Sequence, residues 1–249
     1  MKLKRVLVSL VAVAMTVSLV PAMAFATEVE NDDETAIIEV ADEKAENPAK
    51  FGSGSMIPTS GTCGKNLKWN VDGSGVLTIS GSGAMYNYSY TSGKRAPWFD
   101  LRDKITSVKF SGSPSTIGNY AFYCLKIGAV SIPSSVTSIG TGAFSYSTVS
   151  KISGGSKVKT IGARAFKQTT KLTSFSISSK SLYKIGSYAF QSSAVKTISI
   201  SKTTKLKKKK VRKSLKSSKV KKVNVKNSKK VIYRYYFSKT NAGRKVKVY

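Results

Sequence analysis

The sequence predicts a solenoid, a fold built from stacked repeats. A six-residue phrase occurs four times, and the steps between successive copies are 22, 22 and 24 residues. Each copy follows a short stretch in which apolar and polar residues alternate, which is typical of a β-strand with one buried face. Self-similarity at a near-constant period of this length indicates units that pack against their neighbours. The four copies are IGNYAF (117–122), IGTGAF (139–144), IGARAF (161–166) and IGSYAF (185–190).

The residues of this phrase have different predicted roles. Glycine has no side chain, so it marks a point where the chain bends tightly or closely approaches a neighbouring copy. The alanine is small and the phenylalanine is large, so successive copies can stack one ring over the next. We therefore expect the phenylalanines to form one column inside a shared core: Phe122, Phe144, Phe166 and Phe190.

Residues 1–26 are predicted to be a secretory signal peptide. Three basic residues precede an apolar run at 6–20, and Ala24 and Ala26 occupy the −3 and −1 positions of a cleavage site. The alternative is a membrane anchor, but a run of about 15 residues is shorter than the roughly 20 needed to span a bilayer. We therefore expect a protein that is secreted or held non-covalently at the cell surface, without an integral membrane segment after cleavage.

The rest of the chain divides into a leader, the repeats and one segment at each end of the repeats. The leader is rich in acidic residues and is expected to be disordered. Leu67, Trp69 and Val71 alternate with polar residues before a DGSG turn, which predicts a β-hairpin, and Pro97 marks the start of a short helix. The predicted bounds are 27–58 for the acidic leader, 59–104 for an N-terminal cap, 105–219 for the repeats and 220–249 for a C-terminal cap.

The chain has only two cysteines, so a disulfide framework does not hold the fold together. Cys63 precedes the repeats and Cys124 ends the first of them. The two could pair in an exported protein, whereas two buried free thiols are the simpler interpretation. The sequence leaves both possibilities open.

The repeat pattern resembles a known family of bacterial surface and secreted proteins. Written as L/V-x-x-V-x-I-P-x-x-V-x-x-I-G-x-x-A-F, it resembles the BspA-like leucine-rich repeat family over about residues 59–200. The resemblance weakens where the fifth phrase becomes LKKKKVRKSLKSSK (206–219), although NAGRKVKVY (241–249) resembles the closing segment of such arrays. It implies a right-handed solenoid with a narrow parallel β-sheet on the concave side and short helical or irregular convex turns. It also implies a non-enzymatic role in binding and adhesion.

The alternation within the strands assigns a stripe of small hydroxyl and basic side chains to the outward face of the predicted sheet. Such a stripe can hydrogen-bond a glycan or a peptide that lies along it, although Ser and Thr are also ordinary on a solvated sheet. The candidate ligand-binding residues of this stripe are Lys109, Ser131, Lys151, Ser153, Ser176 and Ser199.

A second candidate is the basic run at 205–222, where eleven of eighteen residues are Lys or Arg. From 104 to 249 the chain has 32 Lys or Arg and no Asp or Glu, which solubility alone does not require. The resulting positive field attracts polyanions, although a charge run can also be a merely solvated face. The candidate residues of this run are Lys207, Lys208, Lys209, Lys210, Arg212 and Lys213.

The expected partners follow from this charge and from the predicted export. They are an extracellular protein, a glycan or an anionic polymer such as a teichoic acid or a sulfated glycan, and binding should weaken with salt. Nucleic acid is expected only as a non-specific ligand.

The inventory of side chains disfavours catalysis and predicts no cofactor or metal site. The chain has no histidine, and its only carboxylates after residue 50 are Asp72, Asp100 and Asp103. A catalytic triad, a zinc site and a pair of carboxylates across a cleft therefore all lack parts. Four aromatic residues near the end are interpreted as the apolar side of the C-terminal cap rather than a stacking platform for sugars or bases: Tyr233, Tyr235, Tyr236 and Phe237.

Two other functions remain open. The protein could be a wall-associated structural protein that its positive charge holds to the anionic polymers of its own envelope. It could also be an inhibitor or a membrane-disrupting cationic factor, which would require the segment 205–222 to act alone.

Overall fold

The computed structural model describes residues 57–200, 206–225 and 230–249. The predicted signal peptide, the acidic leader up to residue 56 and Lys205 of the basic run lie outside these described residues. All the described residues belong to one unit of the chain, Ala45–Tyr249.

The N-terminal part is a five-stranded sheet that continues into the first repeat. The predicted hairpin is present, because β2 and β3 pair antiparallel, and β1 adds a strand on the outer side of β2 that the sequence did not predict. On its other side β3 pairs in parallel with β4 and β5. The bounds are β1 (Ser60–Gly64), β2 (Asn66–Val71), β3 (Val76–Gly83), β4 (Ser107–Phe110) and β5 (Ser113–Pro114).

A short 3-10 helix follows the hairpin, η1 (Phe99–Leu101), directly after the predicted start at Pro97. The side chains of Phe99 and Leu101 are buried, as is that of Trp98.

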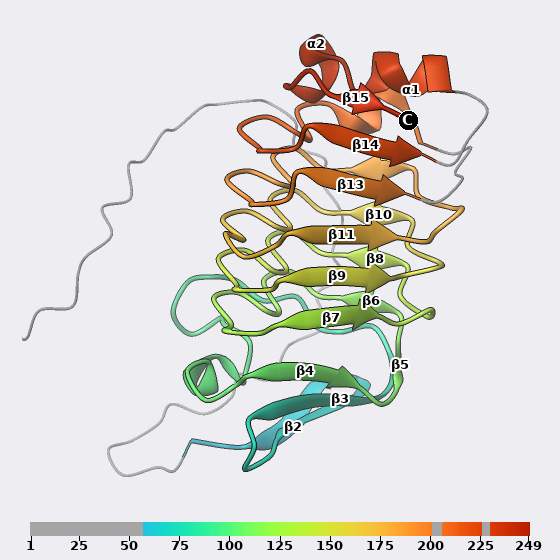
Figure 1. The fold of residues 1–249 in the computed structure, drawn as a ribbon. Helices are drawn as coiled ribbons and strands as arrows, with labels where there is room; N and C mark the ends of the chain where they lie inside the picture. The colour runs from blue at the N-terminus through green and yellow to red at the C-terminus, as the bar shows by residue number, and fades with distance from the viewer. Residues whose placement is uncertain (1–56, 201–205, 226–229) are drawn as a thin grey trace, which may run out of the picture. The chain divides into compact units, whose positions relative to one another are not determined.

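The repeats form a six-stranded parallel sheet, here called the long-strand sheet, which is seen as a stack of arrows in Figure 1. Its parallel ladder continues through β14 and β15, beyond residue 219. The strands are β7 (Ala129–Ile132), β9 (Lys151–Gly154), β11 (Ser174–Ile177), β13 (Thr197–Ile200), β14 (Lys222–Val225) and β15 (Lys247–Val248).

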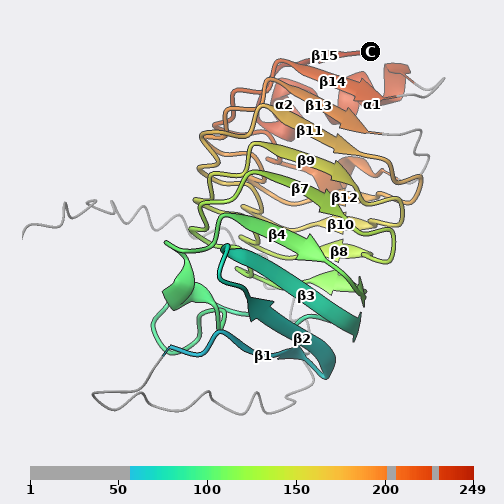
Figure 2. The same cartoon turned by 60° about the horizontal axis from the view of Figure 1, so that its bottom comes forward.

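A second parallel ladder of two-residue strands, here called the short-strand sheet, lies behind the long strands (Figures 1 and 2). The sequence predicted only short helical or irregular turns on this side. Each short strand ends on the isoleucine that precedes the repeated glycine, and that isoleucine is buried. The strands are β6 (Thr116–Ile117), β8 (Ser138–Ile139), β10 (Thr160–Ile161) and β12 (Lys184–Ile185).

The core contains the expected column of phenylalanine rings. Phe122 and Phe144 are stacked with their ring centroids 5.1 Å apart. Phe166 lies 5.4 Å from Phe144 and 5.4 Å from Phe190, again with stacked rings. All four side chains are fully buried. The prediction of a shared core with aligned rings is therefore confirmed.

The repeated glycines are required by close approach between neighbouring coils. A Cβ atom added to Gly162 would lie 2.5 Å from backbone atoms of Gly140 and Thr141, which is shorter than any normal contact. Gly186 is equally close to the backbone of Ala163. Left-handed backbone angles occur elsewhere in the phrase, two residues after the glycine, where φ is 53° at Arg164.

The segment around each phenylalanine aligns its amide groups toward the next coil. The Phe122 N–H donates to the Ala143 carbonyl at 2.7 Å, and the same bond recurs from Phe144 to Ala165 at 2.8 Å. The carbonyls of the first coil have no preceding repeat, and there the indole Nε1–H of Trp98 donates to the Ala121 oxygen at 2.8 Å.

The basic segment keeps the core pattern of the earlier repeats. Its apolar side chains Leu206, Val211, Leu215 and Val220 are buried, although most of its charged side chains are exposed. In earlier coils a hydroxyl three residues after the phenylalanine donates to that residue's carbonyl, as Thr169 does to Phe166. Ser218 makes the same bond to Leu215, so Leu215 stands where the other coils have phenylalanine.

Two short helices follow the last full coil, α1 (Lys230–Tyr236) and α2 (Lys239–Ala242). Tyr233 and Phe237 are buried and belong to the common core cluster, whereas 56% of Tyr235 is exposed. The carbonyl of Ala242 accepts from the N–H of Leu215 at 2.8 Å, so α2 continues the row of bonds between coils.

Ser214 occupies the small-residue position that alanine holds in the earlier phrases, and its buried hydroxyl has no hydrogen-bond partner. We expect Ser214→Ala to raise the free energy of unfolding by about 1 kcal/mol, because a buried unpaired hydroxyl costs about 1–3 kcal/mol. Urea denaturation measures the change. Ser218→Ala is the matched control. It should lower the free energy of unfolding by about 1 kcal/mol, since it removes the hydrogen bond from the Ser218 hydroxyl to the Leu215 carbonyl. A Ser214→Ala protein less stable than the wild type would contradict the prediction.

Candidate functional site

The long-strand sheet presents the predicted outward stripe. Ser131 pairs with Ser153 across β7 and β9, and Ser176 pairs with Ser199 across β11 and β13. Asn224 continues this row on β14 beside Ser199. Neighbouring strands in a sheet lie about 4.8 Å apart, so the row offers hydroxyl groups at that regular spacing.

A second row of outward residues runs beside the hydroxyl row and is more basic. Lys151 on β9 lies between Ala129 and Ser174 on the neighbouring strands. Farther along, Lys222 on β14 pairs laterally with Lys247 on β15. All three lysines are exposed. The stripe is therefore hydroxyl-rich along its length and gains positive charge toward β15.

Lys109 is not on the ladder of strands that carries this stripe. It lies on β4, which belongs to the five-stranded sheet, and its lateral neighbour is Thr78 on β3. The alternation correctly predicts that Lys109 points outward, and its side chain is exposed. The sequence could not show that the ladder of strands is interrupted between β4 and β7.

The first part of the basic run, residues 207–213, lies beside the short-strand sheet, whereas Lys222 at its end lies on β14 of the long-strand sheet. Most of its first lysines form a 3-10 helix, η2 (Lys208–Val211). The N–H of Lys207 donates to the Tyr183 carbonyl at 3.3 Å, which places η2 next to β12. The side chains of Lys207, Lys208, Lys209, Lys210 and Arg212 are exposed, and that of Lys213 is half-buried.

The two sets of predicted site residues therefore lie on different surfaces. The serines and Lys151 share the long-strand sheet, whereas the predicted residues from Lys207 to Lys213 continue the short-strand side. On that side the structure also places Lys159, Tyr183 and Lys184, which the sequence analysis did not single out. The signal was present, because two outward residues stand between two buried ones before each repeated glycine.

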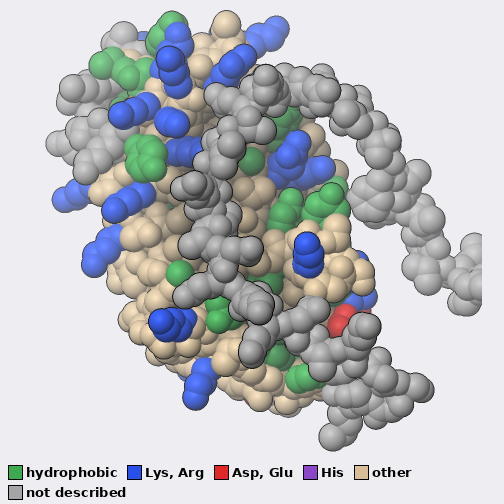
Figure 3. Space-filling view, turned by 180° about the vertical axis from the view of Figure 1, so that it is seen from behind, with side chains coloured by type: hydrophobic (Ala, Val, Ile, Leu, Met, Phe, Trp, Pro, Cys, Tyr) green, Lys and Arg blue, Asp and Glu red, His purple; other side chains and the backbone are tan. Residues whose placement is uncertain are grey.

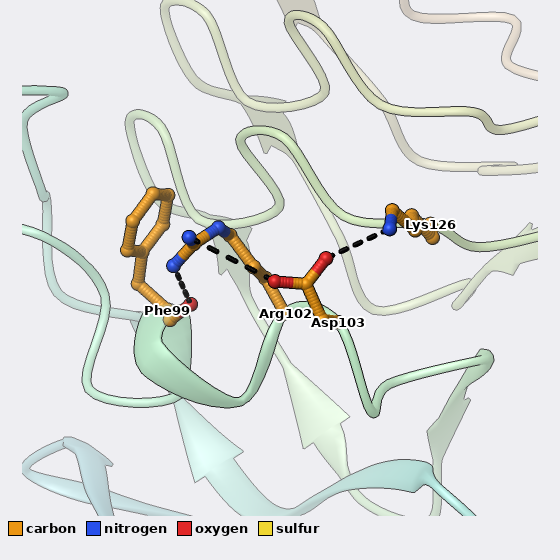
Figure 4. Close-up of polar contacts among 4 residues, drawn as sticks. All are labelled: Phe99, Arg102, Asp103 and Lys126. Carbon is orange, nitrogen blue, oxygen red and sulfur yellow. Dashed lines mark hydrogen bonds and ion pairs between the residues drawn. The ribbon is translucent and has the colours of Figure 1, made fainter. Parts of the chain in front are cut away.

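Two of the three aspartates in the described ranges, Asp72 and Asp103, have structural partners. Asp72 accepts from the N–H groups of Ser74 and Val76, both at 2.9 Å, and so holds the hairpin turn. Asp103 lies 2.8 Å from the Lys126 ammonium and 3.8 Å from the Arg102 guanidinium (Figure 4). The hydrogen bond from Lys126 lowers the pKa of Asp103 below its ordinary value. These side chains are largely exposed, so the ion pairs add little stability.

The two cysteines are not joined to each other. Cys63 is buried, and burial raises the pKa of its thiol to about 12. Burial also raises the pKa of Cys124, which is half-buried. Since the thiolate is the reactive form, neither environment favours a nucleophilic cysteine.

A cleft of about 580 Å³ lies between the α1–α2 segment and β15. Phe237, Val246 and Val248 contribute apolar lining, and Arg234 and Lys239 contribute positive charge. The lining also includes Ser238 and Tyr249, and it contains no Asp, Glu or Cys side chain.

No helix within 57–200, 206–225 or 230–249 is both long enough and apolar enough to cross a bilayer.

The repeats match a known family. The model described as BspA type Leucine rich repeat region (6 copies) matches residues 115–244. No curated protein sequence matches the chain.

The fold is similar to the crystal structure of a leucine-rich repeat protein from Eubacterium ventriosum. The two are 30% identical with a TM-score of 0.57, and the likeness covers 69% of this chain and 45% of that one. A leucine-rich repeat protein from Bacteroides ovatus is 15% identical over 74% of this chain and 76% of that one, but its TM-score of 0.18 supports no shared fold.

The family match covers more than half of the chain, and it spans the coils that build the two parallel sheets. The repeated phrase, the phenylalanine column and the ladder of parallel strands agree with it. The chain therefore belongs to the BspA-type leucine-rich repeat family.

Proposed function

We propose that this is an exported, non-enzymatic binding or adhesion protein whose solenoid presents extended surfaces to host or envelope ligands. The observation that carries the proposal is the outward hydroxyl row, which crosses successive strands of the long-strand sheet at one fixed register. A regular row of donors and acceptors suits a long ligand that is bound at several places. The proposal takes the long-strand sheet as the concave side of a right-handed coil, as the resemblance implies.

Charge adds a second part to the proposal, which is attraction of polyanions. The whole chain has a formal net charge of +30, and no acidic residue follows residue 103. The match covers only 45% of the longer Eubacterium chain. Any partner assigned to this protein as a whole is therefore part of the proposal. Teichoic acids, sulfated glycans and acidic extracellular proteins are the ligand classes that this charge fits.

We expect the chain from residue 27 onward to bind anionic polymers on an array of glycans, teichoic acids and sulfated glycans. The affinity should fall at least tenfold between 50 and 200 mM salt, because each neutralised anion releases a condensed counterion. For nucleic acids, several phosphate contacts together lower the affinity by a factor of about 10³–10⁵ over the same salt range. The array is read at both ionic strengths. If the protein binds only neutral glycans and salt does not change this binding, the hydroxyl row remains the proposed site and the proposed attraction of polyanions is wrong. Absence of binding to every polymer would overturn the proposal.

The competing function is a structural protein that its charge retains on its own cell wall. Extraction with salt distinguishes the two. A retained structural protein should leave its own cells at high salt and show no preference among added polymers, whereas a binding protein should rank them. The exposed basic side chains of η2 are compatible with both functions, and the hydroxyl row favours the binding protein.

A further inference from the structure

We propose that the short-strand side of the solenoid binds a linear phosphodiester polymer, such as a polyol phosphate chain. The inference rests on the polyanion binding proposed above. It assigns that binding to one face and adds residues that lie outside the basic run. The surface is named the basic face here and consists of Lys159, Tyr183, Lys184, Lys207 and Lys208.

The basic face is assembled from three successive coils. The N–H of Tyr183 donates to the Lys159 carbonyl at 2.9 Å, and the N–H of Lys207 donates to the Tyr183 carbonyl at 3.3 Å. These bonds place the three residues in one row across the coils. Lys184 lies beside Thr160 in the parallel register of β12 with β10. The row from Lys159 to Lys207 therefore spans two strand spacings, or about 10 Å.

The ammonium groups of this face are accessible. Lys159, Lys207 and Lys208 are exposed, and Tyr183 and Lys184 are half-buried at the surface. In the view from behind, basic side chains are spread over the coloured surface, and acidic surface is confined to a small spot (Figure 3). Both ion pairs between described residues involve Asp103, which precedes the repeats. The lysines of the basic face thus lie on successive coils without a nearby described carboxylate, and a bound polyanion would offset their positive charge.

The chemistry of the face favours a phosphodiester over a glycan. Its side chains are mainly donors, because lysine ammonium groups donate and cannot accept. The five residues include no carboxylate or carboxamide that would accept hydrogen bonds from sugar hydroxyls. A phosphodiester chain presents anionic acceptor oxygens and fits this set. Lysine is also a compact point charge that tolerates a flexible chain, whereas arginine suits planar, two-pronged recognition.

One lysine of the face has a local partner. The Lys208 ammonium donates to the Tyr235 hydroxyl and lies 4.2 Å from the centre of that ring. It is part of the contact between η2 and α1, so its replacement would change packing as well as charge. The three lysines that test the face are therefore Lys159, Lys184 and Lys207.

The test is a pair of triple variants of the chain from residue 27 onward, with equal changes in net charge. Lys159→Glu/Lys184→Glu/Lys207→Glu removes positive charge from the basic face. Lys65→Glu/Lys68→Glu/Lys104→Glu makes the same change at three exposed lysines of the N-terminal part, which belong to neither candidate surface. Thermal unfolding followed by circular dichroism establishes that each variant folds, and a Lys→Gln version of the first triple provides a milder change. The probe is poly(glycerol phosphate), titrated at several salt concentrations.

The basic-face variant should bind poly(glycerol phosphate) at least tenfold more weakly than the wild type, whereas the control variant should lose about threefold or less. The slope of log affinity against log salt should also fall by about one for each phosphate contact removed. Equal losses in the two variants would overturn the assigned face while leaving polyanion binding intact. Tighter wild-type binding to heparin would overturn the phosphodiester as ligand class. Tighter binding to single-stranded DNA, which is also a phosphodiester chain, would overturn the polyol phosphate as the ligand. No wild-type binding to any of the three probes would overturn the proposed function itself.

Discussion

Phe166→Ala is expected to lower the free energy of unfolding by about 3–5 kcal/mol, the usual cost of removing a buried phenylalanine. The ring is fully buried and stacks at 5.4 Å on both Phe144 and Phe190. It also contacts the edge of Phe175 at 5.1 Å. Removing the ring would leave a cavity in the middle of the column. Neither neighbouring coil can fill this cavity without shifting its own strands against those of the next coil. Urea denaturation followed by far-UV circular dichroism measures the loss.

Tyr90→Ala is the matched control, because it removes an aromatic ring that is 55% exposed and contacts Tyr120 at a ring distance of 5.5 Å. Its expected cost is below about 1 kcal/mol, as for most surface substitutions. If Phe166→Ala costs no more than Tyr90→Ala, the column does not couple the coils and the basis of the solenoid argument is wrong.

Trp98→Ala is expected to cost about 3–5 kcal/mol, because Trp98 closes the column at its N-terminal end. The indole is fully buried, stacks near Phe122 at 6.0 Å and meets the edges of Trp69 and Tyr88 at 5.7 and 5.8 Å. Its Nε1–H also satisfies the Ala121 carbonyl, which has no preceding repeat to bond with. One side chain thus supplies both the apolar contact and the hydrogen bond that a further coil would otherwise provide.

Trp98→Phe separates these two contributions. It keeps an aromatic ring but leaves the Ala121 carbonyl unpaired, so we expect a loss of about 1–3 kcal/mol. Hydrogen exchange followed by mass spectrometry should show faster exchange in the first coil and little change near β13. A Trp98→Phe protein as stable as the wild type would mean that the hydrogen bond adds nothing and that packing alone closes this end.

The repeat unit was predictable from the sequence because its signals are local. The alternation in Val130-Ser131-Ile132 places two side chains inside and one outside, and the structure has this burial pattern in β7. The period of the phrase, together with the size of phenylalanine, was sufficient to predict the column. The identity of residues that point outward could likewise be read from alternation, as at Ser153 and Lys109.

The second parallel ladder was missed because a two-residue strand is too short to show periodicity. Thr160 and Ile161 become a strand only when the neighbouring coils supply partners on both sides. The strand β1 was missed for a similar reason, since SGTCG has little alternation of its own and forms its strand by pairing with β2.

Which residues are buried and how often the unit repeats can be read from the sequence alone, because burial alternation and period are properties of consecutive residues. Which outward residues share a surface follows only from the folded chain. Lys109 lies on a different sheet from the serine row. Lys159, Lys184 and Lys207 lie side by side on successive coils, although more than twenty positions separate each from the next in the sequence. The cause is the register between coils. Hydrogen bonds and ring stacking between neighbouring coils set this register, so it cannot be read from any single repeat.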